Sequence, residues 1–170
     1  MRSPLWAPWR MEYLLANKDR PRCIFCDYPA EPSSNHRERL VLLANEHGAV
    51  LLNRYPFASG HLLVVPRAHV ARLEDLEDDA YDALFRLVRE TQKRLKNAVG
   101  AQALNIGINL GEAAGAGIAE HLHVHIVPRW AGDTNFMPVI ADVRVMPQYL
   151  DETYRRLHPH FADLPGISPL

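Results

Sequence analysis

Three histidines alternate with apolar residues in the run His121-Leu122-His123-Val124-His125-Ile126-Val127-Pro128. A period of two is the side-chain repeat of a β-strand, so the run predicts an extended segment with all three imidazoles on one face. The apolar residues between them, Leu122, Val124 and Ile126, would enter the core. On a helix the same spacing would scatter the rings around the axis. A strand rises ~3.3 Å per residue, so neighbouring rings would stand roughly 6.6 Å apart, which suits contacts to successive groups of one extended ligand.

Two other interpretations of the run are weaker. A solvated strand face with an accidental cluster of histidines would not need strict alternation directly after a glycine-rich loop. Three histidines that bind one catalytic zinc are a further interpretation, because imidazole is a common zinc ligand. Adjacent residues on one strand face converge poorly on a point, however, so we favour contacts to an extended ligand.

The rest of the chain predicts an α+β domain on an antiparallel sheet. Five runs rich in β-forming residues lie at 40–44, 49–53, 62–66, 103–109 and 122–128. Apolar residues at spacings of three and four predict one long helix over 73–99, with acidic residues at its start, basic residues at its end and Gly100 as its stop. Residues 27–38 are polar and contain prolines, which predicts a loop.

Composition narrows the classes of protein. The chain has 170 residues, enough for one domain, and a formal net charge of −1, so no global basic field would collect nucleic acid. No apolar run reaches the ~20 residues of a membrane span. The N-terminus has proline and tryptophan in place of the apolar segment of a secretory signal. We therefore expect a cytoplasmic protein that binds neither nucleic acid nor membranes.

The histidine run matches the motif of the histidine triad (HIT) family, His-φ-His-φ-His-φ-φ with φ apolar, at every position. The resemblance extends to Asn53-Arg54-Tyr55-Pro56 and to Gly60-His61-Leu62-Leu63-Val64-Val65-Pro66. Leu5-Trp6-Ala7-Pro8-Trp9-Arg10 and Pro128-Arg129-Trp130, with the segment 132–137, resemble the bacterial diadenosine-tetraphosphate hydrolase and phosphorylase branch, which is similar to fragile histidine triad protein.

The resemblance runs from about residue 5 to about residue 140 and has implications for architecture. It implies a HIT-like, antiparallel five-stranded sheet with packed helices, and a homodimer whose sheets join edge to edge into ten continuous strands. We divide the chain into an N-terminal arm over residues 1–22 that packs on the domain, the HIT domain over residues 23–146, and a C-terminal extension over residues 147–170 with one short helix.

The resemblance also assigns roles to the triad, which consists of His121, His123 and His125. The middle histidine, His123, would be the nucleophile toward the α-phosphate of a nucleotide, and His125 would hydrogen-bond the phosphate or the bridging oxygen. The chemistry is consistent with this choice. A neutral imidazole has a free lone pair on one nitrogen, while a backbone carbonyl can anchor the N–H of the other.

A nucleotide pocket follows from the same resemblance. The expected nucleotide-binding residues are Asn53, His61, Leu63, Asn109, Ala116, Gly117, His123 and His125. His61 either supports the nucleophile or is an ordinary core histidine. The glycine-rich segment 109–120 predicts backbone N–H groups that cradle phosphate, with a flexible hairpin connection as the alternative. Many relatives carry glutamine, serine or threonine where this chain has Ala116-Gly117, which leaves only backbone N–H groups there.

Cys23-Ile24-Phe25-Cys26 forms a C-x-x-C pair. In HIT relatives with this feature, the cysteines bind zinc together with two histidines, which here would be His69 and His121. Four nitrogen and sulfur ligands leave no open position, so the Zn²⁺ would be structural. A redox role lacks the βαβ context that such pairs have, and a buried pair of reduced cysteines is the remaining alternative.

The main expectation is therefore a nucleotidyl hydrolase or transferase that cleaves dinucleoside polyphosphates, or related adenylylated compounds, at the α-phosphate through a covalent nucleotidyl-histidine. One alternative is a phosphorylase that uses phosphate as acceptor. Another is a nucleotide-binding sensor with slow turnover. A third alternative is a zinc-stabilised module that binds nucleic acid, and the near-neutral net charge argues against it.

Overall fold

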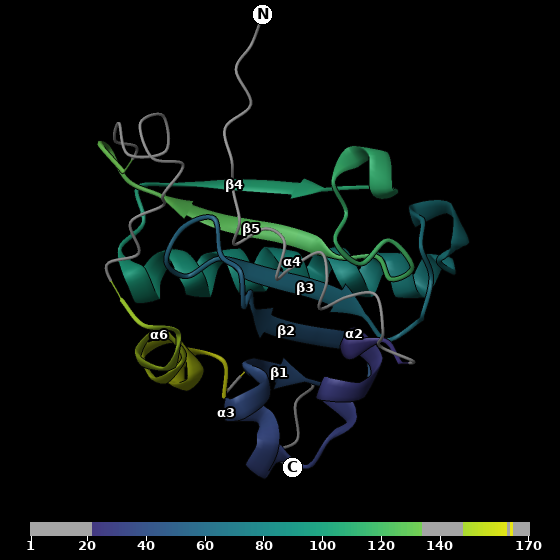
Figure 1. The fold of residues 1–170 in the computed structure, drawn as a ribbon, viewed down its shortest axis with the longest axis horizontal. Coiled ribbons are helices and arrows are strands. Elements are labelled where there is room, and N and C mark those ends of the chain that lie inside the picture. The colour runs from purple at the N-terminus through teal and green to yellow at the C-terminus, as the bar shows by residue number, and fades with distance from the viewer. Residues whose placement is uncertain (1–21, 134–147, 163, 165–170) are drawn as a thin grey trace, which may run out of the picture.

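One antiparallel sheet organises the part of the chain that the computed structural model describes, residues 22–133, 148–162 and 164. Its strands are β1 (Val41–Ala44), β2 (Gly48–Leu52), β3 (Leu62–Pro66), β4 (Ala103–Ile108) and β5 (Val124–Arg129). They are ordered β1-β2-β3-β5-β4, as Figure 1 shows. The five-stranded α+β sheet is therefore confirmed. Most of the predicted N-terminal arm and residues 134–147 lie outside the described residues.

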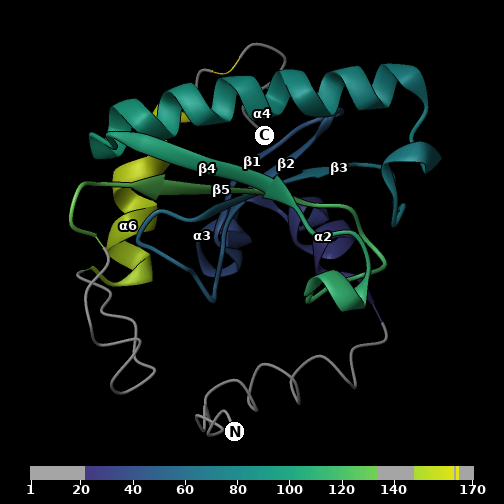
Figure 2. The ribbon, with the colours of Figure 1, turned by 90° about the horizontal axis from the view of Figure 1, so that it is seen from above.

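The helices cover the two faces of this sheet unequally. The long helix α4 (Asp78–Val99) lies across one face, and α2 (Ile24–Asp27), α3 (His36–Arg39) and the loop between β4 and β5 lie on the other side, as Figure 2 shows. The C-terminal extension forms α6 (Leu150–Leu157), which packs against α4. The described residues contain no helix whose length and apolar content would let it cross a bilayer.

Two predictions about local structure are wrong. The helix expected from residue 73 begins at Asp78, because Leu76 and Glu77 are extended and separate it from a 3₁₀ turn, η3 (Leu73–Asp75). Gly100, with a left-handed φ of 64°, ends the helix as expected. The loop expected over 27–38 consists largely of short helical turns, α3 among them. Two of these turns are η1 (Tyr28–Ala30) and η2 (Ser33–Asn35), and prolines are tolerated at the start of such turns, where a missing N–H costs little.

Strand β3 shows why β2 and β3 are continuous apolar runs. Leu62 and Val64 point into the main core between the sheet, α4 and α6, whereas Leu63 and Val65 point to the opposite face. That opposite face carries a smaller apolar cluster, formed by Phe25, Val41, Ala49, Leu51, Leu63 and Val65. Because both faces are covered there, β2 and β3 are buried at every position. We call the smaller group the second apolar cluster.

Candidate active site and metal centre

The histidine run divides its residues between the two faces of the sheet. Leu122, Val124 and Ile126 all belong to the main core. The rings of His123 and His125 lie against each other, with centroids 4.9 Å apart and planes at 68°. These rings are closer together than the spacing of an ideal strand implies, so one small ligand group can reach both.

The strand itself begins later than predicted. β5 starts at Val124, so the first two histidines precede it. The last pair of the β3–β5 ladder joins Val64 to Val124, and the N–H of Leu122 donates instead to the carbonyl oxygen of Val70, at 2.7 Å. Upstream of Val124 the chain thus leaves the ladder and pairs with the loop after β3, which turns the first histidine toward that loop.

The ring of His123 has a defined tautomer. It is 5% exposed, and its Nδ1 lies 2.8 Å from the carbonyl oxygen of His121. A carbonyl can only accept, so Nδ1 carries the proton and Nε2 keeps its lone pair. Burial lowers the pKa of His123, and the hydrogen bond to the His121 carbonyl only partly opposes this shift. The ring is therefore neutral near pH 7, as a nitrogen nucleophile must be.

A chain of hydrogen bonds also fixes the tautomer of His125. The backbone N–H of Phe57 donates to Nδ1 of His61 at 3.1 Å, and the Asn53 amide nitrogen lies 3.2 Å from the same atom. Both are donors, so Nδ1 of His61 accepts and its Nε2 is protonated. That Nε2 lies 2.9 Å from Nδ1 of His125. It donates to this atom, so the proton of His125 is on Nε2.

This Nε2–H of His125 is a buried donor for which the described residues supply no acceptor. An unpaired buried donor costs about 1–3 kcal/mol, and such groups in native proteins call for an explanation. Burial lowers the pKa of His125 to about 4, with the charge of His123 as a smaller cause. A neutral ring with a free N–H beside the His123 lone pair suits an anionic oxygen.

The predicted pocket residues after β2 and at the start of β3 lie close to this chain of hydrogen bonds. Asn53 uses both ends of its amide within the protein, because its Oδ1 accepts from the N–H of Tyr55 at 3.0 Å. His61 is fully buried and contacts His125 rather than the proposed nucleophile. Leu63, paired with His125 in the sheet register, is buried in the second apolar cluster.

The loop 109–120 reaches the same side of the sheet as α2 (Figure 2). It carries three predicted contact residues, Asn109, Ala116 and Gly117. The N–H of Ala116 donates to the carbonyl oxygen of Gly111 at 3.3 Å, which closes the loop on itself. Ile118 packs against the second apolar cluster. The C-terminal end of the loop is thus anchored beside α2.

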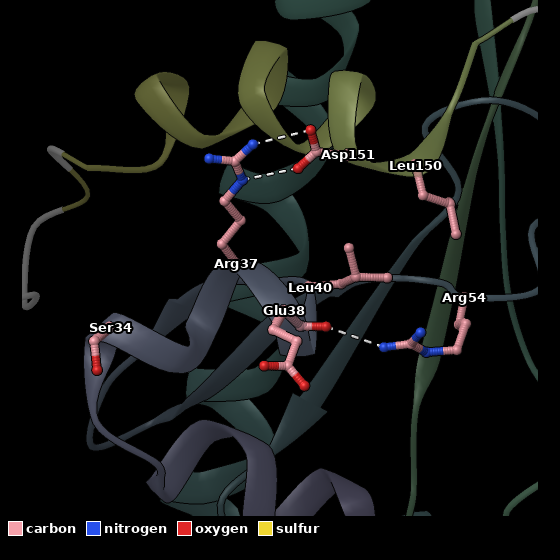
Figure 3. A pocket seen from close by; sticks show the side chains of 7 residues that line it. All are labelled: Ser34, Arg37, Glu38, Leu40, Arg54, Leu150 and Asp151. Carbon is pink, nitrogen blue, oxygen red and sulfur yellow. Dashed lines mark hydrogen bonds and ion pairs between the residues drawn. The ribbon is translucent and has the colours of Figure 1, made fainter.

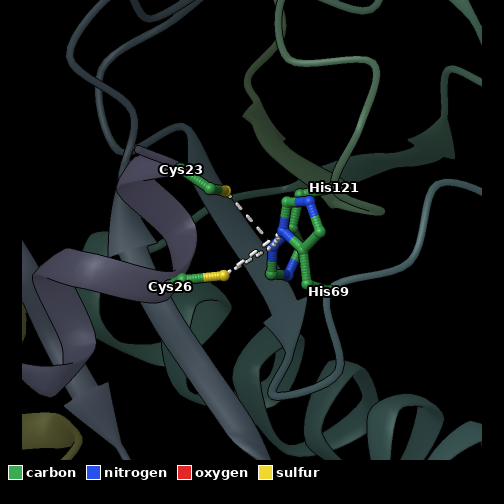
Figure 4. A group of neighbouring side chains, drawn as sticks. All are labelled: Cys23, Cys26, His69 and His121. Atoms are coloured by element: carbon green, nitrogen blue, oxygen red, sulfur yellow. Dashed lines mark hydrogen bonds between the residues drawn. The ribbon is translucent and has the colours of Figure 1, made fainter. Parts of the chain in front are cut away.

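Four predicted metal ligands meet at one point, as Figure 4 shows; they are Cys23, Cys26, His69 and His121. Their sulfur and nitrogen atoms all lie within 4.8 Å of one another. The Nδ1 of His121 is 3.3 Å from the Cys23 sulfur and 3.3 Å from Nδ1 of His69. With bonds of the usual Zn–S and Zn–N length, tetrahedral ligand atoms stand about 3.3–3.8 Å apart. The four donor atoms are therefore already close to the spacing that a tetrahedral zinc site requires.

The ring of His121 is oriented for this role by a backbone group. Its Nε2 donates to the carbonyl oxygen of Pro66 at 3.1 Å, which leaves Nδ1 unprotonated and directed at the cysteines. Burial lowers the pKa of His121 to about 4, so the ring is neutral near pH 7. Burial also raises the pKa of the Cys23 thiol to about 11, so a metal ion that binds there must displace this proton.

Two aromatic residues near the histidines are not among the site residues predicted from the sequence. The Phe57 ring lies 4.6 Å from that of His61 and 5.9 Å from that of His125, between centroids. Phe25 contacts both His121 and His123. Phe25 stands inside the C-x-x-C pair, and Phe57 lies between the segments 53–56 and 60–66. An aromatic residue carries no signal of its own for the face on which it packs.

A separate hollow between α3 and α6 has a volume of about 470 Å³ (Figure 3). It is lined by Ser34, Arg37, Glu38, Leu40, Arg54, Leu150 and Asp151. Arg37 makes two hydrogen bonds to Asp151, at 2.8 and 2.9 Å, which tie α3 to α6. None of the predicted site residues lines this hollow, so it is distinct from the histidine site.

Comparisons with known proteins agree with this geometry. The family model "HIT domain" matches residues 35–132. The AP-4-A phosphorylase of Mycobacterium tuberculosis is 39% identical over 166 residues, which make up 95% of this chain and 85% of that protein. The asymmetrical bis(5'-nucleosyl)-tetraphosphatase of Schizosaccharomyces pombe is 41% identical over 93 residues, 55% of this chain and 50% of that protein.

Among solved structures, a Zn-bound histidine triad family protein from Mycobacterium smegmatis has a TM-score of 0.63 and 26% identity, covering 82% of this chain and 93% of that one. The fold and the row of histidines define a histidine triad protein. The chain belongs to the HIT domain family.

Proposed function

We propose that this protein is an enzyme that cleaves dinucleoside tetraphosphates at the α-phosphate, with His123 as the nucleophile and inorganic phosphate as the acceptor. The observation that carries the proposal is the pairing of two complementary groups. The buried His123 ring has a free Nε2 lone pair, and the neighbouring His125 ring has an Nε2–H with no acceptor among the described residues. A phosphoryl group offers both an electrophilic phosphorus and an acceptor oxygen.

The proposed reaction has two displacements. In the first, Nε2 of His123 attacks the α-phosphorus, an N–P bond forms, and the P–O bond to the β-phosphate breaks. Diadenosine tetraphosphate thereby releases ATP, and the Nε2–H of His125 donates to the departing oxygen. The proton on Nδ1 of His123 stays in place, so the His121 carbonyl stabilises the cationic nucleotidyl-imidazole. In the second, a phosphate oxygen attacks the same phosphorus, the N–P bond breaks, and ADP leaves.

The choice of phosphate over water rests on the Mycobacterium tuberculosis relative, whose similarity spans nearly the whole chain. Hydrolysis is the second candidate, supported by the shorter match to the Schizosaccharomyces pombe tetraphosphatase. Incubation with diadenosine tetraphosphate, with and without phosphate, separates them. Phosphorolysis yields ADP and ATP only when phosphate is present. Formation of AMP and ATP regardless of phosphate would support hydrolysis instead.

The covalent step is tested by mass spectrometry of protein quenched during turnover. We expect one added AMP on His123, and no adduct in His123→Asn. His47→Asn is the matched control, because this histidine is exposed on the turn before β2 and should leave the adduct intact. An adduct on any other residue would refute the assignment of the nucleophile.

The nucleotide itself is proposed to lie over the second apolar cluster. Leu51 and Leu63 would form the floor under the base, and Asn53 would contact the ribose from the end of β2. Asn109 and the backbone of Ala116-Gly117 would contact the phosphates. Leu63→Ala should raise KM for the nucleotide more than it lowers kcat, and an unchanged KM would contradict this placement.

Zn²⁺ is the proposed occupant of the cysteine–histidine centre, where it would have a structural role. The ligand spacing and the orientation of His121 by Pro66 support this choice, as does the zinc-bound relative. Zinc bound there would cross-link α2, the loop after β3 and the start of the triad. We expect one zinc per chain in purified protein. Cys26→Ser should lose this zinc and unfold at a lower temperature, and retention of full zinc content would contradict the site.

The free edge of β4 supports a homodimer whose two sheets join. Among the described residues, β4 has a strand neighbour on one side only, and its Ile106 is 48% exposed. The other edge, β1, is partly covered, since Tyr154 of α6 donates to the carbonyl oxygen of Val41. A lysine on a strand edge opposes pairing, so Ile106→Lys should convert a dimer to a monomer in light scattering. A wild-type protein that is monomeric would refute this part of the proposal.

A further inference from the structure

The segment between the two cysteines reaches the nucleophile through one side chain, that of Phe25. The helix that carries it, α2, has only four residues, too few to be stable by itself. Its position therefore depends on tertiary contacts. One set of contacts is the metal centre, at Cys23 and Cys26, and the other is the second apolar cluster, in which Phe25 is 4% exposed.

The Phe25 ring touches two of the three triad rings. Its centroid lies 5.5 Å from that of His121, with the planes at 75°, and 5.2 Å from that of His123, with the planes at 45°. Aromatic rings in such contacts prefer edge-on and tilted arrangements. The phenyl ring therefore limits how far the imidazole of His123 can rotate about its side-chain bonds.

The second constraint on His123 comes from the same centre. Its Nδ1–H donates to the backbone carbonyl of His121, and the His121 ring is held between the Pro66 carbonyl and the cysteine sulfurs. Two groups thus orient His123 from this side. One is the ring of Phe25, which lies between Cys23 and Cys26 in the sequence, and the other is the backbone carbonyl of His121, itself a proposed metal ligand.

We propose that Phe25 is a positioning residue that couples occupancy of the metal centre to the orientation of His123. The inference rests on the role proposed above for His123. When Zn²⁺ is bound, the two thiolates fix α2, and Phe25 holds the imidazole with Nε2 facing the substrate. When Zn²⁺ is removed, α2 is no longer fixed and the imidazole gains rotational freedom. The metal centre thereby sets the rate of the first displacement without contacting the nucleotide.

The first test needs no substrate. Long-range ¹H–¹⁵N spectra of the imidazoles are recorded for zinc-loaded protein and after zinc is removed with a chelator. The proteins are wild type, Phe25→Leu and Val41→Ala. Val41 belongs to the same apolar cluster but lies on β1, which β2 and β3 separate from β5. Circular dichroism checks that each protein keeps its fold, and His123→Asn identifies the signals.

We expect the His123 signals to change in zinc-loaded Phe25→Leu and in zinc-free wild type, and to stay unchanged in Val41→Ala. Zinc removal should then alter these signals less in Phe25→Leu than in wild type. The proposal is overturned when zinc removal leaves the His123 signals of wild type unchanged, or when it changes them equally in wild type and in Phe25→Leu. The wild-type comparison decides the matter even when the variant is unstable.

The second test measures the first displacement in a single turnover with diadenosine tetraphosphate. Partners that orient a metal ligand typically contribute 10- to 100-fold to metal affinity or activity, and Phe25 contacts the proposed ligand His121. Zinc-loaded Phe25→Leu should therefore form the His123 adduct roughly 10- to 100-fold more slowly. Its zinc content should match wild type, and KM should change much less than kcat. A raised KM with unchanged kcat would overturn the proposal. When wild type forms no adduct, the proposed function fails, while the imidazole spectra still decide the coupling.

Discussion

Replacement of His61 tests the hydrogen-bond chain that fixes the proton of His125. The two edges of the His61 ring have separate tasks, because Nδ1 accepts from the Phe57 N–H and Nε2 donates to His125. Asparagine places its amide near the Nδ1 position, and glutamine reaches the Nε2 position. His61→Asn therefore keeps a partner for Phe57 and loses the donor to His125, whereas His61→Gln can keep that donor.

The expected loss of rate in His61→Asn follows from the lost hydrogen bond between His61 and His125. In His61→Asn the Nδ1 of His125 loses its donor inside the protein, which costs about 1–3 kcal/mol for a buried polar group. The ring of His125 also becomes free to move its proton from Nε2 to Nδ1, and Nε2–H is the proposed donor to the departing oxygen. A factor of ten corresponds to about 1.4 kcal/mol in a rate. The first displacement should thus slow by roughly 5- to 150-fold.

The assay is the rate of adduct formation on His123 in a single turnover, measured by rapid quench for wild type and both variants. His61→Gln should stay within about tenfold of wild type, because it keeps the donor to Nδ1 of His125. Thermal unfolding monitors the fold of each variant. Equal rates for the two variants would refute the separate tasks of the two edges. An unchanged rate in His61→Asn would refute the claim that His61 holds the proton of His125 on Nε2.

Two further predictions concern stability. Gly48→Ala should lower the free energy of unfolding by about 1–3 kcal/mol, the usual cost of overpacking, because a Cβ there would lie 2.3 Å from the Val65 carbonyl oxygen. Urea unfolding measures this change. Gly107→Ala is the control, since no atom of the described residues lies within 4 Å of its Cβ position. Burial lowers the folded pKa of His125 from 6.5 to about 4. Between these pH values the unfolded chain binds more protons than the folded protein, so the free energy of unfolding falls as the pH decreases. His125→Asn should lose less of this free energy between pH 6.5 and 4, and parallel curves of unfolding free energy against pH for the two proteins would contradict this.

Some features could be predicted from the sequence because they depend on local periodicity. The alternation at 121–126 identified both the core residues and the row of imidazoles, and the spacing of leucines identified the long helix up to Gly100. Side-chain period is set by the backbone conformation of one segment alone. No distant part of the chain is needed to recognise it.

The starts of elements depend on more distant contacts and were predicted less well. β5 begins at Val124 because Leu122 pairs with Val70 in place of β3. α4 begins at Asp78 because Leu76 leaves the helical conformation and is buried in the main core. In both places, tertiary packing outweighs a periodic pattern that continues past the boundary in the sequence.

The sequence by itself determined which chemical groups this protein has: three imidazoles on one extended run and a cysteine pair with two histidines to complete it. Only the tertiary structure decided which nitrogen of each ring is available. The carbonyls of His121 and Pro66 and the N–H of Phe57 set those tautomers. Backbone groups are the same in every residue, so their use as partners depends on how the chain folds and leaves no mark in the sequence.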